Sequence, residues 1–144
     1  MFKSLFYRYV LLIFGSLSLI AQKKIELEDV FSIQYANEIE ISPDGNLIIY
    51  RKMHFDIMED RSAGSLWIMN SDGTEHQKLT TLDQDEYSPK WSPSGDRIAF
   101  VSKGKNGPEI FVYWLNSRSF ARLTQLPESP SSITWSNNEK YIAF

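Results

Sequence analysis

The chain has 144 residues, a formal net charge of −3 and no cysteine. The lack of cysteine excludes disulfides, thiolate metal sites and a lipid-anchored cysteine from these residues, and the mild acidity does not favour nucleic acid as a partner. The length leaves room for one ordinary domain, and 14% aromatic with 23% charged residues is typical of a folded, β-rich chain.

Residues 1–21 have the pattern of a secretory signal peptide. A basic start carrying Lys3 and Arg8 precedes a mostly apolar run, Tyr9–Ile20, and Ala21 offers a small residue for cleavage. An uncleaved membrane anchor is the alternative, but the run is shorter than the roughly 20 residues that span a bilayer. We therefore expect an exported chain, periplasmic or secreted, with no stable membrane insertion after cleavage.

Residues 22–37 are predicted to form a lead-in with a short helix. Within Ile25–Tyr35, Leu27, Val30 and Phe31 recur at helical spacing and acidic residues gather at the start of the segment. This helix is expected either to pack on the edge of the following domain or to dock on a second one.

The rest of the chain, residues 38–144, repeats one pattern of strand, polar turn and strand. Its three copies are IEISPDGNLIIY from residue 39, SPKWSPSGDRIAF from residue 88 and ITWSNNEKYIAF from residue 133. The following halves, SLWIMNSDGTEHQKLT and EIFVYWLNSRSFARLT, align at an offset of 44 residues. Four short strands in each unit of about 40–45 residues indicate β-propeller blades.

The predicted fold class is therefore all-β, a partial propeller of four-stranded antiparallel blades. Blade one is expected to have strands near Glu38–Ser42, Leu47–Arg51, Ser65–Asn70 and His76–Thr80. Blade two spans about Ser88–Thr124. A third blade starts near Ser132 and reaches only its second strand at Phe144, so we expect the propeller to be truncated at the C-terminus. Trp67, Trp91 and Trp135 are predicted to be equivalent and to pack between blades.

Because strands alternate in direction, the connections after second and fourth strands should share one face of the propeller. That face would collect Lys52–Gly64, the longest connection, with Thr81–Tyr87, Gly104–Pro108 and Gln125–Ser131. A domain joined to the ends of the propeller is expected to cover this face.

Five residues are candidates for an interdomain or substrate-side contact. Asp56, Glu59, Asp60 and Arg61 lie in the connection Lys52–Gly64. The fifth is Trp114, an aromatic residue at the position where blade one has Asn70. The alternative for the first four is a solvated loop with a local salt bridge that contributes little to stability.

No catalytic, cofactor-binding or metal-binding residue is predicted in these 144 residues. They contain no Gly-x-Ser-x-Gly elbow. The two histidines, His54 and His76, stand on different elements with no triad pattern. The Asp-Gly turns fail as calcium loops, because Lys52 and Leu79 fall where a ligating glutamate is required.

The sequence pattern of the blades, WSPSGDRIAF followed by a hairpin ending in KLT or RLT, resembles the propeller repeats of the prolyl oligopeptidase family of serine peptidases and of the TolB translocation protein. LEDVF, ISPDG and DIMEDR are similar to the acylaminoacyl-peptidase-like and dipeptidyl-peptidase-like branch. In blade three, Asn137-Asn138-Glu139 departs from the usual Pro-Asp-Gly.

The resemblance implies an N-terminal propeller that gates access to a C-terminal α/β-hydrolase domain, whose Ser-Asp-His triad cleaves peptides. None of that triad falls within these residues. The expected partners are that hydrolase domain and peptide substrates. The alternative is a non-enzymatic, TolB-like propeller that serves as a protein-binding or scaffold module.

Overall fold

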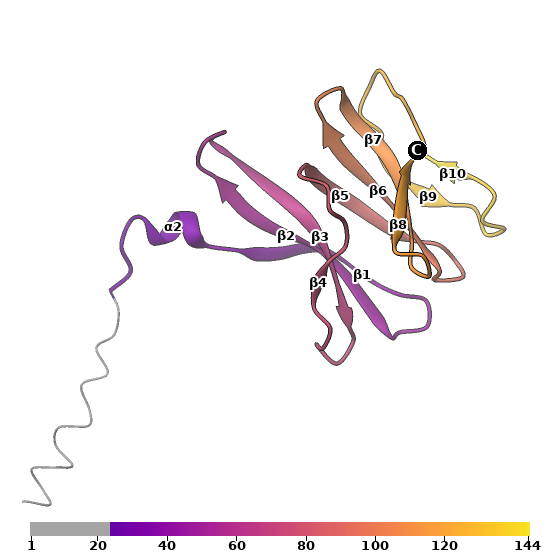
Figure 1. Ribbon diagram of the computed structural model, residues 1–144, viewed down its shortest axis with the longest axis horizontal. Coiled ribbons are helices and arrows are strands. Elements are labelled where there is room, and N and C mark those ends of the chain that lie inside the picture. The colour runs from indigo at the N-terminus through magenta and orange to yellow at the C-terminus, as the bar shows by residue number, and fades with distance from the viewer. Residues whose placement is uncertain (1–23) are drawn as a thin grey trace, which may run out of the picture.

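The computed structural model describes residues 24–144, and they form two complete blades and a further hairpin. Blade one has the strand order β1 (Tyr35–Ile41), β2 (Leu47–Asp56), β3 (Arg61–Asn70) and β4 (Gln77–Lys78); blade two has β5 (Asp85–Trp91), β6 (Arg97–Gly104), β7 (Gly107–Trp114) and β8 (Ser119–Arg122); and β9 (Thr134–Trp135) pairs with β10 (Ile142–Ala143). All pairs are antiparallel, and the sheets lie side by side (Figure 1). The predicted fold class is confirmed.

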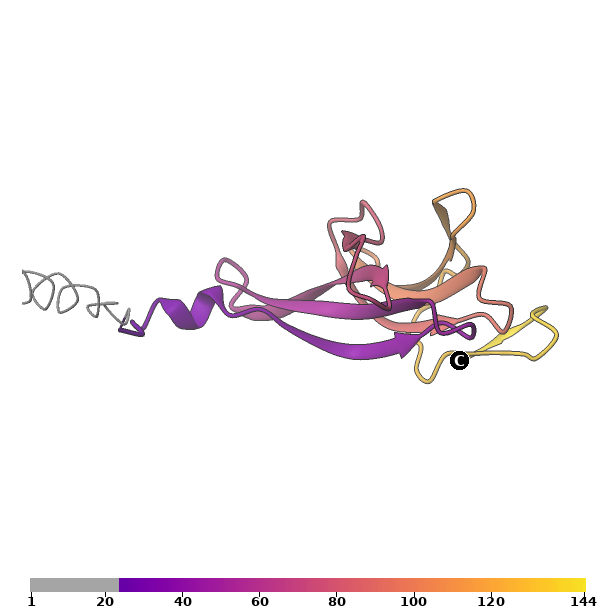
Figure 2. The ribbon, with the colours of Figure 1, turned by 90° about the horizontal axis from the view of Figure 1, so that it is seen from below.

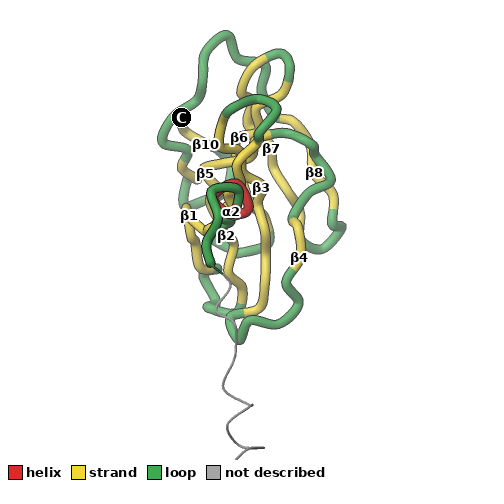
Figure 3. Tube along the Cα trace, turned by 90° about the vertical axis from the view of Figure 1, so that its left-hand side faces the viewer, coloured by secondary structure: helices red, strands yellow, loops and turns green. Residues whose placement is uncertain are grey.

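The predicted signal peptide lies outside the described residues. Among residues 24–144, no helix is long and apolar enough to cross a membrane. The single helix in this part, α2 (Asp29–Ser32), is one turn long, as Figure 3 shows.

The short helix predicted within Ile25–Tyr35 is confirmed as α2, which occupies only Asp29–Ser32 of that segment, since β1 already begins at Tyr35. The side chains expected to form its apolar face are largely exposed, Leu27 at 85% and Val30 at 55%. Only Phe31 has an aromatic partner, with its ring centroid 5.4 Å from that of Phe55 on β2. A helix of this length depends on packing, and here it has little.

The prediction that Lys52–Gly64 is a loop is wrong. β2 and β3 continue in register through Lys52↔Ser65 to Asp56↔Arg61, and four residues, 57–60, make the turn. The hairpin extends toward α2 (Figure 2). In blade two the corresponding hairpin is shorter, with eight residues in each strand, so the six extra residues of blade one lengthen both strands and the turn.

The core lies between blades and not within them. Blade one contributes Ile49, Leu66, Ile68 and Leu79 to a buried cluster with Ile98 and Phe100 of blade two. A second cluster joins blade two to the third, with Ala99, Val101, Ile110, Val112 and Ile133. Neighbouring residues of one strand, such as Ile98 and Ala99, therefore serve different interfaces, as strand alternation requires.

A tryptophan on the first strand of a blade bonds to the blade before it. The indole Nε1 of Trp91 donates to the carbonyl of Glu40 (3.4 Å), and that of Trp135 donates to the carbonyl of Lys90 (3.1 Å). Trp67 differs: it lies on β3, where blade two has Phe111, and Lys52 Nζ lies 4.5 Å from its ring centroid. The predicted equivalence therefore holds for Trp91 and Trp135 but not for Trp67.

Each blade also repeats a left-handed residue, which lies on the first strand in blades one and two and just before it in the third. Glu38, Ser88 and Ser132 have φ between 48° and 53°, and in blades one and two the residue coincides with a break in register typical of a β-bulge. The carboxylate of Glu38 accepts a hydrogen bond from the backbone N–H of Ser88. One bulge thus stabilises the next.

The turn of the third blade shows how a departure from the repeat is offset. Glu139 has φ 58° where Gly45 and Gly95 have 76° and 75°. A side chain in this conformation costs roughly 1 kcal/mol. The carboxylate of Glu139 accepts hydrogen bonds from Ser94 and pairs with Arg97, so the strained residue ties blade three to blade two.

We predict that Trp91→Phe and Trp135→Phe each lower the free energy of unfolding by about 0.5–1.5 kcal/mol beyond the effect of lost area, because each removes one hydrogen bond between blades. Urea unfolding followed by circular dichroism measures the change. Trp67→Phe is the matched control, since its indole N–H has no hydrogen bond within residues 24–144. Equal losses in all three variants would contradict the role of the indole bonds.

Candidate functional site: a polar cavity at the hairpin face

A cavity of about 660 Å³ opens where the long hairpin of blade one meets blade two. Its walls are the end of the β2–β3 hairpin, the connection between the blades and the β6–β7 turn. The charged residues that line it comprise four acids and three bases: Asp56, Glu59, Asp83, Asp85, Arg61, Lys103 and Lys105. The cavity is therefore lined by charges of both signs.

Three of the five predicted site residues line this cavity, namely Asp56, Glu59 and Arg61. Asp60 does not line it and occupies the left-handed position of the hairpin turn, with φ 47°. Asp56 also shapes that turn, because its Oδ1 accepts the backbone N–H of Met58 (3.1 Å) and of Glu59 (3.2 Å).

The structure separates Trp114 from the other four. It lies at the end of β7, opposite Arg97 in register, and lines a different cavity beside the third blade. There it packs against the cluster of Val112 and Ile133. Nothing tests a contact of any of the five with substrate or with another domain, so that role stays a prediction.

The cavity agrees with the expectation that certain connections share a face. The predicted segments Lys52–Gly64, Thr81–Tyr87 and Gly104–Pro108 all contribute lining residues. Gln125–Ser131 does not. Sequence reasoning missed Lys103, which belongs to β6 and has no special signal, and Asp85, which stands just before a bulge.

One of the residues that line the cavity, Asp85, belongs to a charge pair that joins the two blades. Asp85 Oδ1 accepts hydrogen bonds from Arg51 Nη2 (2.7 Å) and from the backbone N–H of Gly64 (2.7 Å). Arg51 Nη1 also reaches Glu38 (3.2 Å), and its guanidinium lies 5.6 Å from the ring centroid of Tyr87. The Arg51 and Asp85 side chains are only 13% and 15% exposed.

Gly64 is needed at this point because there is no room for a side chain. A Cβ there would lie 2.4 Å from Arg51 Nε and 2.8 Å from Met53 Sδ. The guanidinium therefore packs directly on the backbone of β3 and reaches Asp85.

A buried carboxylate lies behind the cavity and holds the strands of blade one to β5. Glu86 is fully buried, and its Oε2 accepts the backbone N–H of Leu66 (2.9 Å) while its Oε1 accepts the hydroxyl of Thr80. Burial raises the pKa of Glu86, with the Thr80 and Leu66 hydrogen bonds opposing that shift. Sequence reasoning missed Glu86, because its counterpart in the next blade is Pro130.

In blade two the equivalent backbone N–H of the third strand is paired without a buried carboxylate from the next blade. There the backbone N–H of Ile110 donates to Thr124 Oγ1 (2.9 Å), and that hydroxyl donates to Glu109 Oε2 (3.0 Å). Thr80 and Thr124 thus occupy equivalent positions. In blade one a carboxylate accepts both the threonine hydroxyl and the backbone N–H of the third strand, whereas in blade two the threonine hydroxyl itself accepts that N–H.

The cavity can bind by charge and hydrogen bonding, but it has no nucleophile with a base. Within residues 24–144 no serine or threonine hydroxyl donates to a histidine, and no three His, Cys, Asp or Glu side chains gather as metal ligands. Its mixed charges fit a peptide with a charged end or the surface of another domain.

The fold and repeat define the class of protein: the chain consists of propeller blades of the kind that peptidases and TolB carry. No family model matches the chain. It is 31% identical over 71 residues to dipeptidyl-peptidase 5 of Porphyromonas gingivalis, covering 49% of this chain and 10% of that protein. Against a Bacillus subtilis protein named "Uncharacterized peptidase YuxL" it is 23% identical over 122 residues, covering 84% and 19%.

TolB is a relative as well. The Tol-Pal system protein TolB of a Polaromonas species is 37% identical over 49 residues, which are 34% of this chain and 12% of that protein. The sequence pattern of the blades predicted a resemblance to such peptidases with TolB-like repeats, and that resemblance is confirmed.

Solved structures share the fold. The acylaminoacyl peptidase of Pyrococcus horikoshii superposes with a TM-score of 0.66 at 19% identity, covering 83% of this chain and 18% of that one. The propeller domain of the trilobed protease of Pyrococcus furiosus gives 0.61 at 18% identity, covering 76% and 32%. The chain spans about a fifth or less of the length of the curated relatives it matches.

We predict that Gly64→Ala lowers the free energy of unfolding by about 1–3 kcal/mol, because the new methyl group displaces Arg51 and Met53. The loss should be smaller when Arg51→Ala is already present, and urea unfolding of both single variants and the double variant measures the coupling. Additive effects would contradict the packing of Arg51 on Gly64.

We predict that Glu86→Gln becomes more stable relative to the unchanged protein as pH rises. The folded state binds the Glu86 proton more tightly than the unfolded state, so this group favours folding below its ordinary value of 4.5 and the benefit is lost as pH rises through the raised pKa. Denaturant unfolding across a pH series tests this, with the exposed Glu128→Gln as control. A pH-independent difference between Glu86→Gln and the unchanged protein would contradict it.

Proposed function

We propose that this chain supplies the first blades of the propeller of an exported serine peptidase, in which the propeller gates access to a C-terminal α/β-hydrolase domain. The observation that carries the proposal is the similarity to two proteins named as peptidases, one of which aligns over 84% of this chain. The chemistry would reside in residues beyond these 144.

The position of the polar cavity supports the gating role. It lies on the face that carries the connections between blades, where a domain joined to the propeller would lie. Among the charged residues that line it, Asp85 is held by a pair with Arg51 that joins the two blades. A rim that carries charges of both signs suits contact with a hydrolase domain and with the charged ends of short peptides.

Export is the second part of the proposal. It rests on the basic start, the apolar run and the small residue of the first 21 residues. N-terminal sequencing of the protein recovered from the culture medium or from a periplasmic extract would identify the cleavage site expected after Ala21.

A TolB-like binding module is the second candidate, favoured by the 37% identity over 49 residues to TolB. Such a propeller would bind a protein and have no hydrolase. The two candidates differ in what a complete reading frame encodes and in whether its product cleaves peptides.

The test is a peptidase assay on the protein made from the complete open reading frame that contains these residues. We expect hydrolysis of dipeptidyl nitroanilides, complete inactivation by a fluorophosphonate, and covalent labelling of one serine outside residues 1–144. A folded product that cleaves no peptide substrate and takes no label would reject the peptidase and leave the binding module.

A pair of variants tests the cavity itself. We expect Asp56→Asn with Glu59→Gln to lower kcat/KM by about two- to thirtyfold, since exposed charge contacts contribute about 0.2–1 kcal/mol each. Glu75→Gln, in the turn at the opposite end of blade one, is the control. Equal activity of the two variant proteins would place the cavity outside the path of the substrate.

A further inference from the structure

The β6–β7 hairpin of blade two ends in a tight turn that carries an asparagine followed by a glycine. Gly104 and Gly107 pair at the ends of the two strands, and Lys105 and Asn106 make the turn between them. Both turn residues are exposed. Asn106-Gly107 is the only Asn-Gly pair in the 144 residues. The turn therefore presents this pair to solvent.

The side chain of an asparagine can react with the backbone of the residue that follows it. The deprotonated backbone nitrogen of Gly107 attacks the side-chain carbonyl carbon of Asn106. A carbon–nitrogen bond forms and closes a succinimide ring, the side-chain carbon–nitrogen bond breaks, and the departing nitrogen takes up the proton and leaves as ammonia. Water then opens the ring at either carbonyl and gives aspartate or isoaspartate. The balance is a hydrolysis, with water consumed and ammonia released.

Gly107 favours this attack by its lack of a side chain. Glycine leaves the approach of its own nitrogen unhindered and has wide backbone freedom. Gly107 has φ 106°, and within residues 24–144 no heavy atom beyond its chain neighbours lies within 4 Å of the position of a Cβ there. Because Gly104 pairs with Gly107, the turn has to open before the ring can close. Local opening of an exposed turn costs little free energy.

Several other asparagines are restrained by hydrogen bonds that Asn106 lacks. The side-chain amide of Asn46 donates to a carboxylate (2.8 Å), and that of Asn70 donates to a hydroxyl (2.8 Å). The side-chain oxygen of Asn138 accepts hydrogen bonds within its own turn (2.8 and 3.1 Å). The side chain of Asn106 makes no hydrogen bond with residues 24–144, so it is free to rotate toward Gly107.

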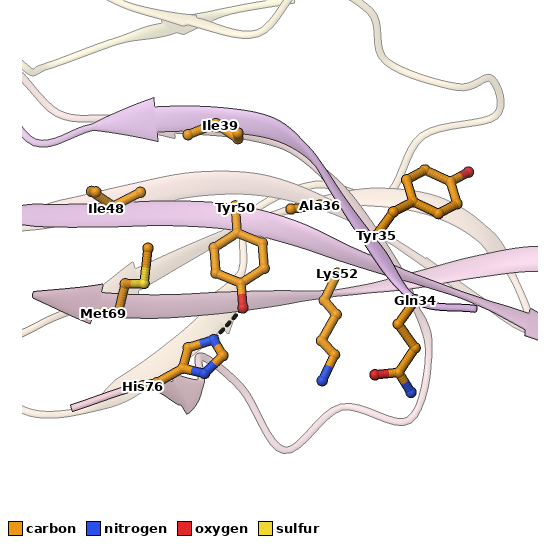
Figure 4. Close-up of a pocket in the computed structure, with 9 residues that line it drawn as sticks. All are labelled: Gln34, Tyr35, Ala36, Ile39, Ile48, Tyr50, Lys52, Met69 and His76. Atoms are coloured by element: carbon orange, nitrogen blue, oxygen red, sulfur yellow. Dashed lines mark hydrogen bonds between the residues drawn. The ribbon is translucent and has the colours of Figure 1, made fainter. Parts of the chain in front are cut away.

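The turn lies at two polar cavities, where a change of charge has partners. Lys105 lines both the cavity of about 660 Å³ at the hairpin face and a neighbouring one of about 280 Å³, and Asn106 lines the second. Arg122 and Glu109 line the second cavity as well. The cavity of about 530 Å³ on blade one differs, since its lining is almost wholly apolar and includes no asparagine (Figure 4).

We propose that Asn106 is a deamidation site, and that its conversion makes the rim of the two polar cavities more acidic as the protein ages. The product carries a negative charge where the original turn has a neutral amide. Isoaspartate also adds a methylene group to the backbone, which disturbs the pairing of Gly104 with Gly107. The inference goes beyond the proposed function, because the reaction needs only this turn and water.

The test is a peptide map of the protein made from the complete open reading frame, incubated at several pH values. Peptide-resolved mass spectrometry follows the mass gain of deamidation at each asparagine. Asn116 is the matched internal control: it is exposed in the turn after β7 and makes no side-chain hydrogen bond with residues 24–144, but Ser117 follows it. The Asp-Gly pairs do not interfere, because isomerisation of aspartate leaves the mass unchanged.

We expect Asn106 to gain mass several-fold faster than Asn116 in the folded protein. The rate should rise with pH, because the Gly107 nitrogen attacks only after it has lost its proton. Anion-exchange chromatography should resolve the converted protein as a more acidic form. Asn106→Gln should nearly abolish this form, since the longer side chain closes the corresponding ring much more slowly.

Equal rates at Asn106 and Asn116 in the folded protein would overturn the proposal. A fast reaction at Asn106 in urea alone would overturn it as well, since the folded turn would then not open far enough to react. The measurement does not depend on peptidase activity. Conversion of Asn106 in a folded protein that cleaves no peptide would keep the modification site and reject the peptidase.

Discussion

The face shared by consecutive blades is the contact on which the structure depends. A sheet of four short strands has two sides to cover, and here the second strand of blade two supplies both: Ile98 and Phe100 pack on blade one, while Ala99 and Val101 pack toward the third blade. Each blade is therefore stabilised mainly by its neighbours, as in other repeat architectures. The indole bonds of Trp91 and Trp135 fix the position of one blade on the next, and apolar burial supplies most of the stability.

The polar groups between the blades depend on that packing. Arg51 reaches Asp85 because the two blades hold β2 and β5 together, and Glu86 is buried because β5 lies against β3. Buried charges contribute to stability only when their partners are in place, so these pairs are better regarded as fixing the register between blades. The cavity at the hairpin face depends on the same contacts, since Asp85, which lines it, accepts hydrogen bonds from Arg51 and from the backbone of Gly64.

The repeat made the blades predictable, and departures from the repeat were predicted less well. The offsets of 50 and 44 residues located both complete blades. The six extra residues were predicted to form a loop, because apolar and polar residues do not alternate strictly from His54 to Arg61. In the structure they lengthen two paired strands and the turn between them. The short helix could be predicted from the spacing of Leu27, Val30 and Phe31, but its exact bounds could not, since Leu27 and Val30 are exposed and do not fix them by packing. Asp56, Glu59 and Arg61 could be found as a charged cluster. Glu86 could not, since a single buried carboxylate has no periodic signal.

The central claim is that these blades belong to a larger propeller with a hydrolase domain. Sequencing of the source DNA beyond the codon for Phe144 tests it most directly. The account predicts an open frame that continues through further blades to a Gly-x-Ser-x-Gly elbow, followed by an aspartate and then a histidine. Further blades followed by a stop codon, with no such elbow, would contradict the peptidase and leave a binding propeller.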